Sequence, residues 1–159
     1  MLKCPYHQPA KLLPHTGKMV LLDSVLECSE NHIVATATID EDCILLPHNN
    51  ATHLPTYLSI EIMAQTVGAW TGAKALSVGE KVRIGFLLGT RRLTMPVPQI
   101  AVGTVLRCES QLSWQDDTGM GVFDCVLFNH ADNSEIAIAS LNLYRPNEQD
   151  LQNILSNAQ

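Results

Sequence analysis

A carboxylic acid and two histidines stand close together in ILLPHNNATHLPTYLSIEIMAQTVGAW, residues 44–70. Glu61 lies among apolar residues, and His48 and His53 precede it. Apolar surroundings favour the protonated form of a carboxyl group, which can then act as a general acid, and imidazole is a suitable base near neutral pH. The segment therefore indicates acid–base chemistry. The alternatives are that Glu61 is solvated near a helix start and that each histidine makes a single hydrogen bond in a loop.

Other classes of catalytic site find less support in the sequence. A metal site built from both imidazoles and Glu61 lacks a further cluster of ligands. There is no GxSxG motif of a serine hydrolase, and TGMG at residues 118–121 is more typical of a hairpin than of a nucleotide-binding loop. The five cysteines are widely spaced without a CxxC, which favours reduced, packed thiols.

One long helix is predicted from Tyr57 to about Ser77. Pro55 and Thr56 suit its start, with Thr56 as the cap, and Gly79 stands where a helix commonly ends. The helix is apolar on nearly every side, so we expect it to be buried with other structure wrapped around it.

A narrow stripe interrupts the apolar surface of this helix. Glu61, Gln65, Gly68 and Gly72 follow helical spacing and share one face, which is polar at one end and small at the other. The stripe places the candidate acid beside a polar side chain one turn further on.

Strand-like runs flank the helix on both sides. They are residues 19–28, 32–39, 83–94, 102–114, 121–129 and 135–144, and the tail from residue 147 could form a short surface helix. Antiparallel strands with one long buried helix predict an α+β domain whose sheet curls around the helix.

Composition and charge limit the remaining classes. The chain has 159 residues, 46% of them hydrophobic and 16% charged, which fits one domain over residues 1–159. The N-terminus lacks the apolar core of a signal peptide, so a cytoplasmic protein is expected. The net charge of −6 argues against nucleic-acid binding. Residues 74–92, with five basic residues against one acidic residue, are either a solvated face or a dock for an acidic partner.

Three segments resemble bacterial 3-hydroxyacyl-[acyl carrier protein] dehydratases. LLPHTGKMVLLDSV (12–25) resembles the opening of that family, and residues 43–68 are similar to its active-site segment, in which a histidine, a proline-containing loop and a helix with Glu-x-x-Ala-Gln follow one another. Residues 85–112 resemble the strand and loop after the helix. The similarity extends from residue 12 to about residue 145 and is strongest to the divergent dehydratases of aryl-polyene clusters.

The resemblance implies a hot-dog fold, in which one long helix is wrapped by a curved antiparallel sheet, and a dimer with two composite sites. The dimer is a homodimer or a heterodimer with a dehydratase paralogue. By motif position Glu61 is the acid and His48 is the base contributed by the other subunit, with His53 as the fallback.

The same resemblance implies the reaction and the supporting groups. Water would be removed from a 3-hydroxyacyl thioester to give a trans-2-enoyl thioester, without a metal or redox cofactor. The backbone N–H groups of Thr56 and Tyr57 would polarise the thioester carbonyl, although Thr56 stands where the family has glycine. Gln65 would orient Glu61 or close the site by a hydrogen bond. The substrate would be carried on the phosphopantetheine of an acyl carrier protein, which Arg91 and Arg92 would contact.

Three alternatives stay open. A hot-dog thioesterase would use the helix carboxylate to direct water at the carbonyl. A non-catalytic subunit would support a catalytic paralogue, and a ligand-binding module would bury Glu61 for structural reasons. In the dehydratase interpretation the acyl chain lies along the helix, where Met63 or Trp70 sets the depth of its tunnel.

Overall fold

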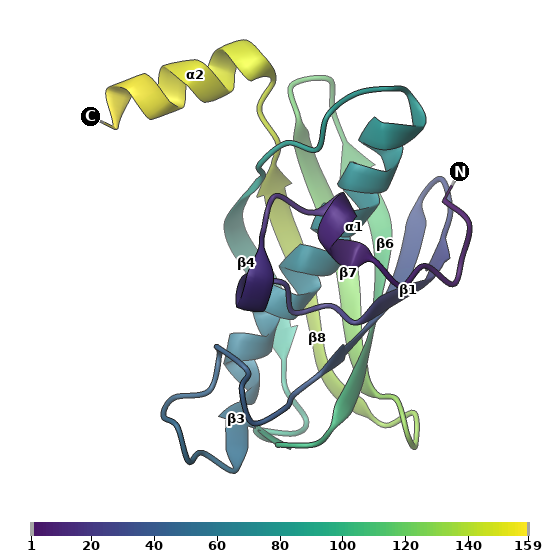
Figure 1. The fold of residues 1–159 in the computed structure, drawn as a ribbon, viewed down its shortest axis with the longest axis vertical. Helices are drawn as coiled ribbons and strands as arrows, with labels where there is room; N and C mark the ends of the chain where they lie inside the picture. Colours follow the sequence, from purple (N-terminus) through teal and green to yellow (C-terminus); the bar gives the residue numbers. More distant parts are fainter. Residues whose placement is uncertain (1, 159) are drawn as a thin grey trace.

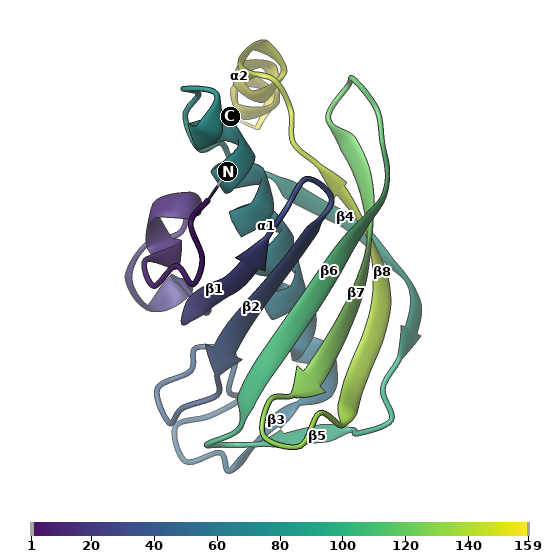
Figure 2. The same ribbon diagram turned by 90° about the vertical axis from the view of Figure 1, so that its right-hand side faces the viewer.

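A computed structural model describes residues 2–158 and contains one long helix wrapped by an antiparallel sheet (Figure 1). The helix is α1 (Ile60–Ser77), and the sheet bends around it (Figure 2). The strand order is β1-β2-β6-β7-β8-β4, with every pair antiparallel. The strands are β1 (Ser24–Cys28), β2 (His32–Thr38), β4 (Phe86–Thr94), β6 (Val105–Gln115), β7 (Met120–Asn129) and β8 (Glu135–Tyr144). The predicted α+β architecture is confirmed.

The start of α1 differs from the prediction. Residues His53–Pro55 form a short strand, β3, paired with β5 (Gln99–Ala101), and a 3₁₀ turn, η3 (Thr56–Ser59), leads into the helix. Thr56 is 1% exposed, and its hydroxyl donates to the Val97 carbonyl at 2.6 Å. Thr56 is therefore not the cap, because its side chain is committed to the neighbouring loop. The helix end is as predicted, since Gly79 has φ +77° and its N–H donates to the Leu76 carbonyl.

Apolar packing between α1 and the sheet makes the core. Ile62, Met63 and Val67 are at most 2% exposed, and the Trp70 ring meets Phe123 edge-on with centroids 5.3 Å apart. The helix is buried on several sides because the sheet covers one side and the N-terminal segment covers another (Figure 2).

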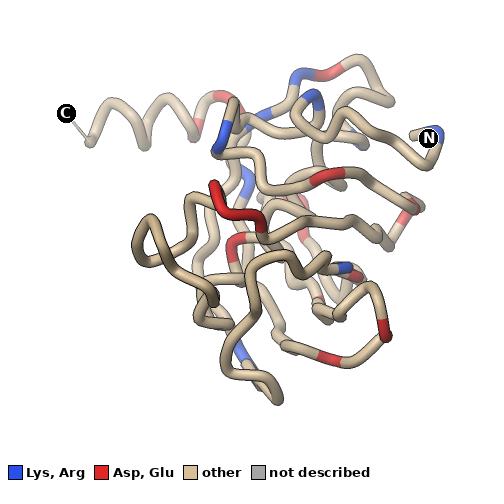
Figure 3. The backbone as a smooth tube through the Cα atoms, turned by 60° about the horizontal axis from the view of Figure 1, so that its bottom comes forward, with Lys and Arg blue, Asp and Glu red and all other residues tan. Residues whose placement is uncertain are grey.

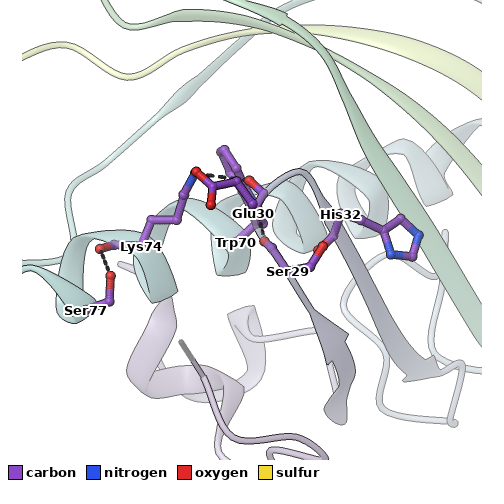
Figure 4. A network of polar contacts seen from close by, with 6 residues as sticks. All are labelled: Ser29, Glu30, His32, Trp70, Lys74 and Ser77. Carbon is purple, nitrogen blue, oxygen red and sulfur yellow. Dashed lines mark hydrogen bonds and ion pairs between the residues drawn. The ribbon is translucent and has the colours of Figure 1, made fainter.

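Polar contacts tie the β1–β2 turn to the second half of α1 (Figure 4). The Trp70 indole N–H donates to the Ser29 carbonyl at 3.1 Å, and the Lys74 ammonium donates to the Glu30 carbonyl at 3.0 Å. Lys74 also lies 4.5 Å from the centre of the Trp70 ring. These contacts fix the rotation of the helix about its axis relative to the sheet.

The glycines of the stripe let the N-terminal segment approach α1 closely. This segment contains two 3₁₀ turns, η1 (Pro9–Leu12) and η2 (Gly17–Met19). A Cβ placed on Gly72 would lie 1.9 Å from the Leu12 carbonyl oxygen, whereas one on Gly68 would lie 3.1 Å from the end of the Leu13 side chain. The stripe is therefore the surface on which this segment packs.

The two edges of the sheet differ. At β1, Tyr6 forms a bridge to Val25 and so covers part of the edge. At the opposite edge β4 pairs only with β8 among the described residues, and Leu87 and Leu88 are 40% and 56% exposed. An edge strand with exposed apolar side chains is open to pairing with another chain.

Helix α2 (Glu148–Asn157) projects from the body of the protein (Figure 1). Asn147 caps it by accepting from the Asp150 N–H at 2.8 Å. Neither of the two α-helices within residues 2–158 has the length and apolar character needed to cross a membrane.

Candidate active site

Glu61 lines a cavity of about 430 Å³ between α1 and strands β4, β7 and β8. Val67 and Trp70 of the helix, with Phe123 and Leu143 of the sheet, give the cavity an apolar wall. Polar and charged side chains line the rest of the cavity, and a cavity of this size is typical of a small-molecule site.

The immediate surroundings of Glu61 are more polar than the sequence indicated. Its side chain is 44% exposed, and its Oε1 lies 3.7 Å from Nε2 of His15. The expected apolar enclosure is therefore not provided by this chain alone. The difference arises because His15 and Glu61 are far apart in sequence, and the N-terminal segment brings the imidazole to the helix.

Gln65 bonds to the N-terminal segment and not to Glu61. It is 2% exposed, its carbonyl oxygen accepts from the Leu21 N–H at 2.9 Å, and its amide donates to the Met19 carbonyl at 2.7 Å. The oxygen and the nitrogen of the amide both bond to the N-terminal segment, and neither forms a hydrogen bond with Glu61. The same contacts explain why residues 19–23 do not extend β1: two of their backbone groups bond to a helix side chain instead of a strand.

His48 and His53 both lie upstream of the helix on exposed backbone. His48 is in the loop between β2 and β3, and His53 is in β3, where its Nδ1 is 2.9 Å from the Thr52 hydroxyl. Neither histidine makes a hydrogen bond or ion pair with Glu61 in this single chain. Because the composite site pairs groups from two subunits, the choice between His48 and His53 stays a prediction.

One of the two predicted carbonyl-polarising groups is already engaged. The Thr56 N–H donates to the Pro98 carbonyl at 3.0 Å, as a continuation of the β3–β5 pairing. It is not free to bind a thioester oxygen, so that expectation is corrected. Tyr57, whose side chain is exposed, stays the candidate for this role.

The basic residues separate into two groups. Arg91 and Arg92 are exposed on the edge strand β4, where Arg92 has φ 53° within an irregularity of the pairing. Lys74, Arg83 and Arg145 instead line the cavity that contains Glu61. Several Lys and Arg positions gather near the base of α2, whereas Asp and Glu are more widely spread (Figure 3).

Arg145 is the least compensated of the basic residues at the cavity. Burial lowers the pKa of its guanidinium, and the nearby charge of Arg83 lowers it further. Lys74 faces Glu30 at 3.9 Å and Arg83 pairs with Glu80 at 3.0 Å, but no carboxylate within residues 2–158 pairs with Arg145. A half-buried cation beside another cation favours an anionic ligand.

His15 is the site residue that sequence reasoning missed. It lies in the Pro-His of the opening segment, which carried the family resemblance without assigning a function to this imidazole. The stripe Glu61–Gln65–Gly68–Gly72 could have indicated that another segment lies beside Glu61, because the polar and small face of a buried helix must pack against another part of the protein. It did not identify the segment that covers it.

Comparison with known families and structures supports the resemblance. The family model described as ApeP dehydratase, of the ApeP-like family, matches residues 7–156. The dehydratase heterocomplex ApeI:P from Xenorhabdus doucetiae contains a chain that is 30% identical, with 97% of this chain and 99% of that chain covered at a TM-score of 0.83. The comparison with curated proteins found no match.

More distant structures share the fold. A hypothetical thioesterase from Streptococcus pneumoniae with coenzyme A is 16% identical, with 76% of this chain and 83% of that chain covered at a TM-score of 0.55. The E. coli PaaI protein is 14% identical, with 76% and 81% covered at a TM-score of 0.57. Together with the heterocomplex, these matches confirm the predicted hot-dog fold.

Proposed function

The chain belongs to the ApeP-like dehydratase family, and from this we propose that it takes part in dehydrating a 3-hydroxyacyl thioester to a trans-2-enoyl thioester. The observation that carries the proposal is the combination of the family match over residues 7–156 with Glu61, the matching helix carboxylate, at a cavity that has an apolar wall. We further propose aryl-polyene or fatty-acid biosynthesis as the setting, on the resemblance of the active-site segment.

The reaction assigns one proton transfer to each catalytic group. A base takes the C2 proton, the C2 electron pair forms the C2–C3 double bond, and the C3–O bond breaks as Glu61 donates a proton to the departing hydroxyl. The base opposite Glu61 comes from the other subunit, and His48 of this chain, with His53 as the fallback, is the proposed base of the other composite site. The Tyr57 N–H would stabilise negative charge on the thioester oxygen, a contribution of up to about 3–4 kcal/mol for one donor. The chemistry requires no metal or redox cofactor.

A second subunit would complete the site. The open edge at β4, with Leu87 and Leu88 exposed, offers a surface for that subunit. The matched ApeI:P structure is a heterocomplex, which supports a dehydratase paralogue over a second copy of this chain. A subunit lying over Glu61 would exclude water from its carboxyl group and so favour the protonated form that a general acid needs.

The basic residues at one end of the cavity could bind the phosphate of the group that carries the thioester. Arg83 and Arg145 lie where helix α1 ends, and Glu61 lies near its start. From Glu61 to Lys74 the helix rises about 20 Å at 1.5 Å per residue, comparable to an extended pantetheine arm. We therefore propose that Arg145 and Arg83 bind the phosphate of phosphopantetheine, while Arg91 and Arg92 contact an acidic carrier protein.

The test is to assay the full chain alone and mixed with a dehydratase paralogue, using one 3-hydroxyacyl group on pantetheine and on an acyl carrier protein. Mass spectrometry should show loss of one water from the intact thioester. Free acid and thiol would instead identify a thioesterase. Replacing Glu61 with Gln should remove turnover at the composite site in which Glu61 is the acid. Replacing His48 with Ala should remove turnover at the second composite site, in which His48 is the base. Full activity of the mixture with both changes would refute catalysis by this chain and leave it a supporting subunit.

A further inference from the structure

His15 is held against Glu61 by the way the N-terminal segment packs. Its Nε2 lies 3.7 Å from Oε1 of Glu61, and its side chain is 30% exposed at the cavity. On the preceding side, Leu12 lies against Gly72, and on the following side Gln65 bonds to Met19 and Leu21. Both flanks of the histidine are thus fixed to the same helix that carries the acid.

The other ring nitrogen of His15 identifies the protonation state that fits the site. Nδ1 is buried and is the one buried side-chain nitrogen or oxygen within residues 2–158 that has no hydrogen-bond partner. An imidazolium carries a proton on both nitrogens, so the charged form would leave a buried N–H unpaired, which is costly. The neutral ring with its proton on Nε2 leaves only an unpaired acceptor at Nδ1, which is less costly than an unpaired charged donor, and directs its N–H at Glu61.

The remaining charges around the cavity do not replace this contact. Besides Glu61 on α1, the titratable and charged groups that line the cavity with His15 are Lys74, Arg83, Asp116, Asp117, Tyr144 and Arg145. None of them forms an ion pair or a side-chain hydrogen bond with either His15 or Glu61. His15 is therefore the one described side chain positioned to orient the carboxyl group.

We propose that His15 is a positioning residue for Glu61: its Nε2, 3.7 Å from Oε1 in the single chain, closes to hydrogen-bond distance in the assembled site, where the neutral imidazole donates to one carboxyl oxygen and leaves the other directed at the substrate. This inference rests on the proposed function, because it assigns His15 to the acid of that reaction. It adds an in-chain partner for Glu61 to the histidine that the second subunit contributes.

Three variants test the role in the assembly with a dehydratase paralogue, each combined with His48→Ala so that turnover comes only from the site that contains Glu61. His15→Ala removes the donor, and we expect kcat to fall by about 10- to 100-fold with little change in KM, as for a misplaced catalytic group. His15→Gln places an uncharged amide N–H near the former Nε2 and should restore most of the activity, with an unchanged pH profile. His130→Gln, in the exposed β7–β8 turn, is the matched control and should behave as the wild type.

The pattern of rescue separates positioning from proton transfer. If His15→Gln is as inactive as His15→Ala while both stay folded, and the limb of the pH profile near neutrality disappears, His15 transfers a proton and the proposal is overturned. If His15→Ala keeps normal kcat, His15 has no role. In a Glu61→Gln background His15→Ala should have no further effect, because one residue acts through the other.

A spectroscopic measurement decides the contact without relying on turnover. Nitrogen NMR of the full chain should show the neutral His15 ring with its proton on Nε2 and not on Nδ1 between about pH 7.5 and pH 8.5, where an ordinary imidazole is uncharged. Glu61→Gln should shift the Nε2 signal. A doubly protonated His15 in this range, or a signal insensitive to Glu61→Gln, overturns the proposal. Normal turnover of Glu61→Gln would instead refute the proposed function, and the NMR result would still show whether the two side chains are coupled.

Discussion

Replacing Gly72 with Ala should damage both stability and catalysis, although Ala is the better helix former. The new Cβ would lie 1.9 Å from the Leu12 carbonyl oxygen and 2.8 Å from the carbonyl carbon. Because Cβ contacts essentially never fall below 3.0 Å, the backbone of η1 must move by about 1.1 Å. This backbone cannot relieve the clash by a bond rotation, as the end of a flexible side chain could.

Opposing terms set the size of the effect on stability. Overpacking a core costs about 1–3 kcal/mol, and a clash with backbone belongs at the upper end of that range, whereas Gly to Ala in a helix gains about 1 kcal/mol. We expect a net loss of about 2 kcal/mol, which corresponds to a fall in Tm of about 4–8 °C for a chain of this size. Because Leu12 is three residues before His15, the same displacement should lower kcat by as much as about 100-fold.

Gly68→Ala is the matched control for this experiment. Its Cβ would lie 3.1 Å from Cδ2 of Leu13, a side-chain end that can give by a few tenths of an ångström. Thermal unfolding followed by circular dichroism should show an unchanged or slightly higher Tm, and turnover should be close to wild type. A Gly72→Ala protein as stable and active as Gly68→Ala would refute the account of the stripe as a surface for close backbone approach.

Three further predictions concern the carrier, the assembly and a thiol. Arg145→Gln should raise KM several-fold for phosphopantetheine-bound substrate at unchanged kcat, and a thioester without the phosphate should show no such difference in steady-state assays. Leu88→Asp on β4 should weaken subunit association measured by analytical ultracentrifugation, whereas an intact assembly would exclude that edge as the interface. Burial raises the pKa of the Cys43 thiol, so the reactive thiolate is present above that raised pKa and is lost below it. Its alkylation should therefore be slower in native than in unfolded protein at pH 8, and equal rates would contradict the assigned environment.

Much of the fold follows from local patterns in the sequence. The length and all-round apolar character of residues 57–77 identified a buried helix, and Gly79 marked its end because the left-handed backbone there suits glycine. Strands β6, β7 and β8 lie within two or three residues of their predicted bounds. These features depend on neighbours in sequence, which a pattern can represent.

The errors concern contacts between distant segments. The apolar neighbours of Glu61 in the sequence suggested apolar surroundings, but in the fold the carboxyl group faces His15. Thr56 has the residue type of a helix cap, yet the β3–β5 pairing takes its N–H and the Val97 carbonyl takes its hydroxyl. Gln65 was assigned to the acid because it is one turn away, but it bonds to Met19 and Leu21. Spacing along one helix shows which residues share a face, but it does not show which distant segment packs against that face.

The packing of the N-terminal segment on α1 also has a consequence for biosynthesis. Residues 9–22 leave the ribosome long before Gly72, the residue that receives Leu12, has been translated. During that interval the segment has no helix face to dock on, and its buried leucines stay available to other hydrophobic surfaces. The His15–Glu61 contact can therefore form only after α1 has been made, so the site residue that comes first in the sequence must wait for the helix that carries its partner.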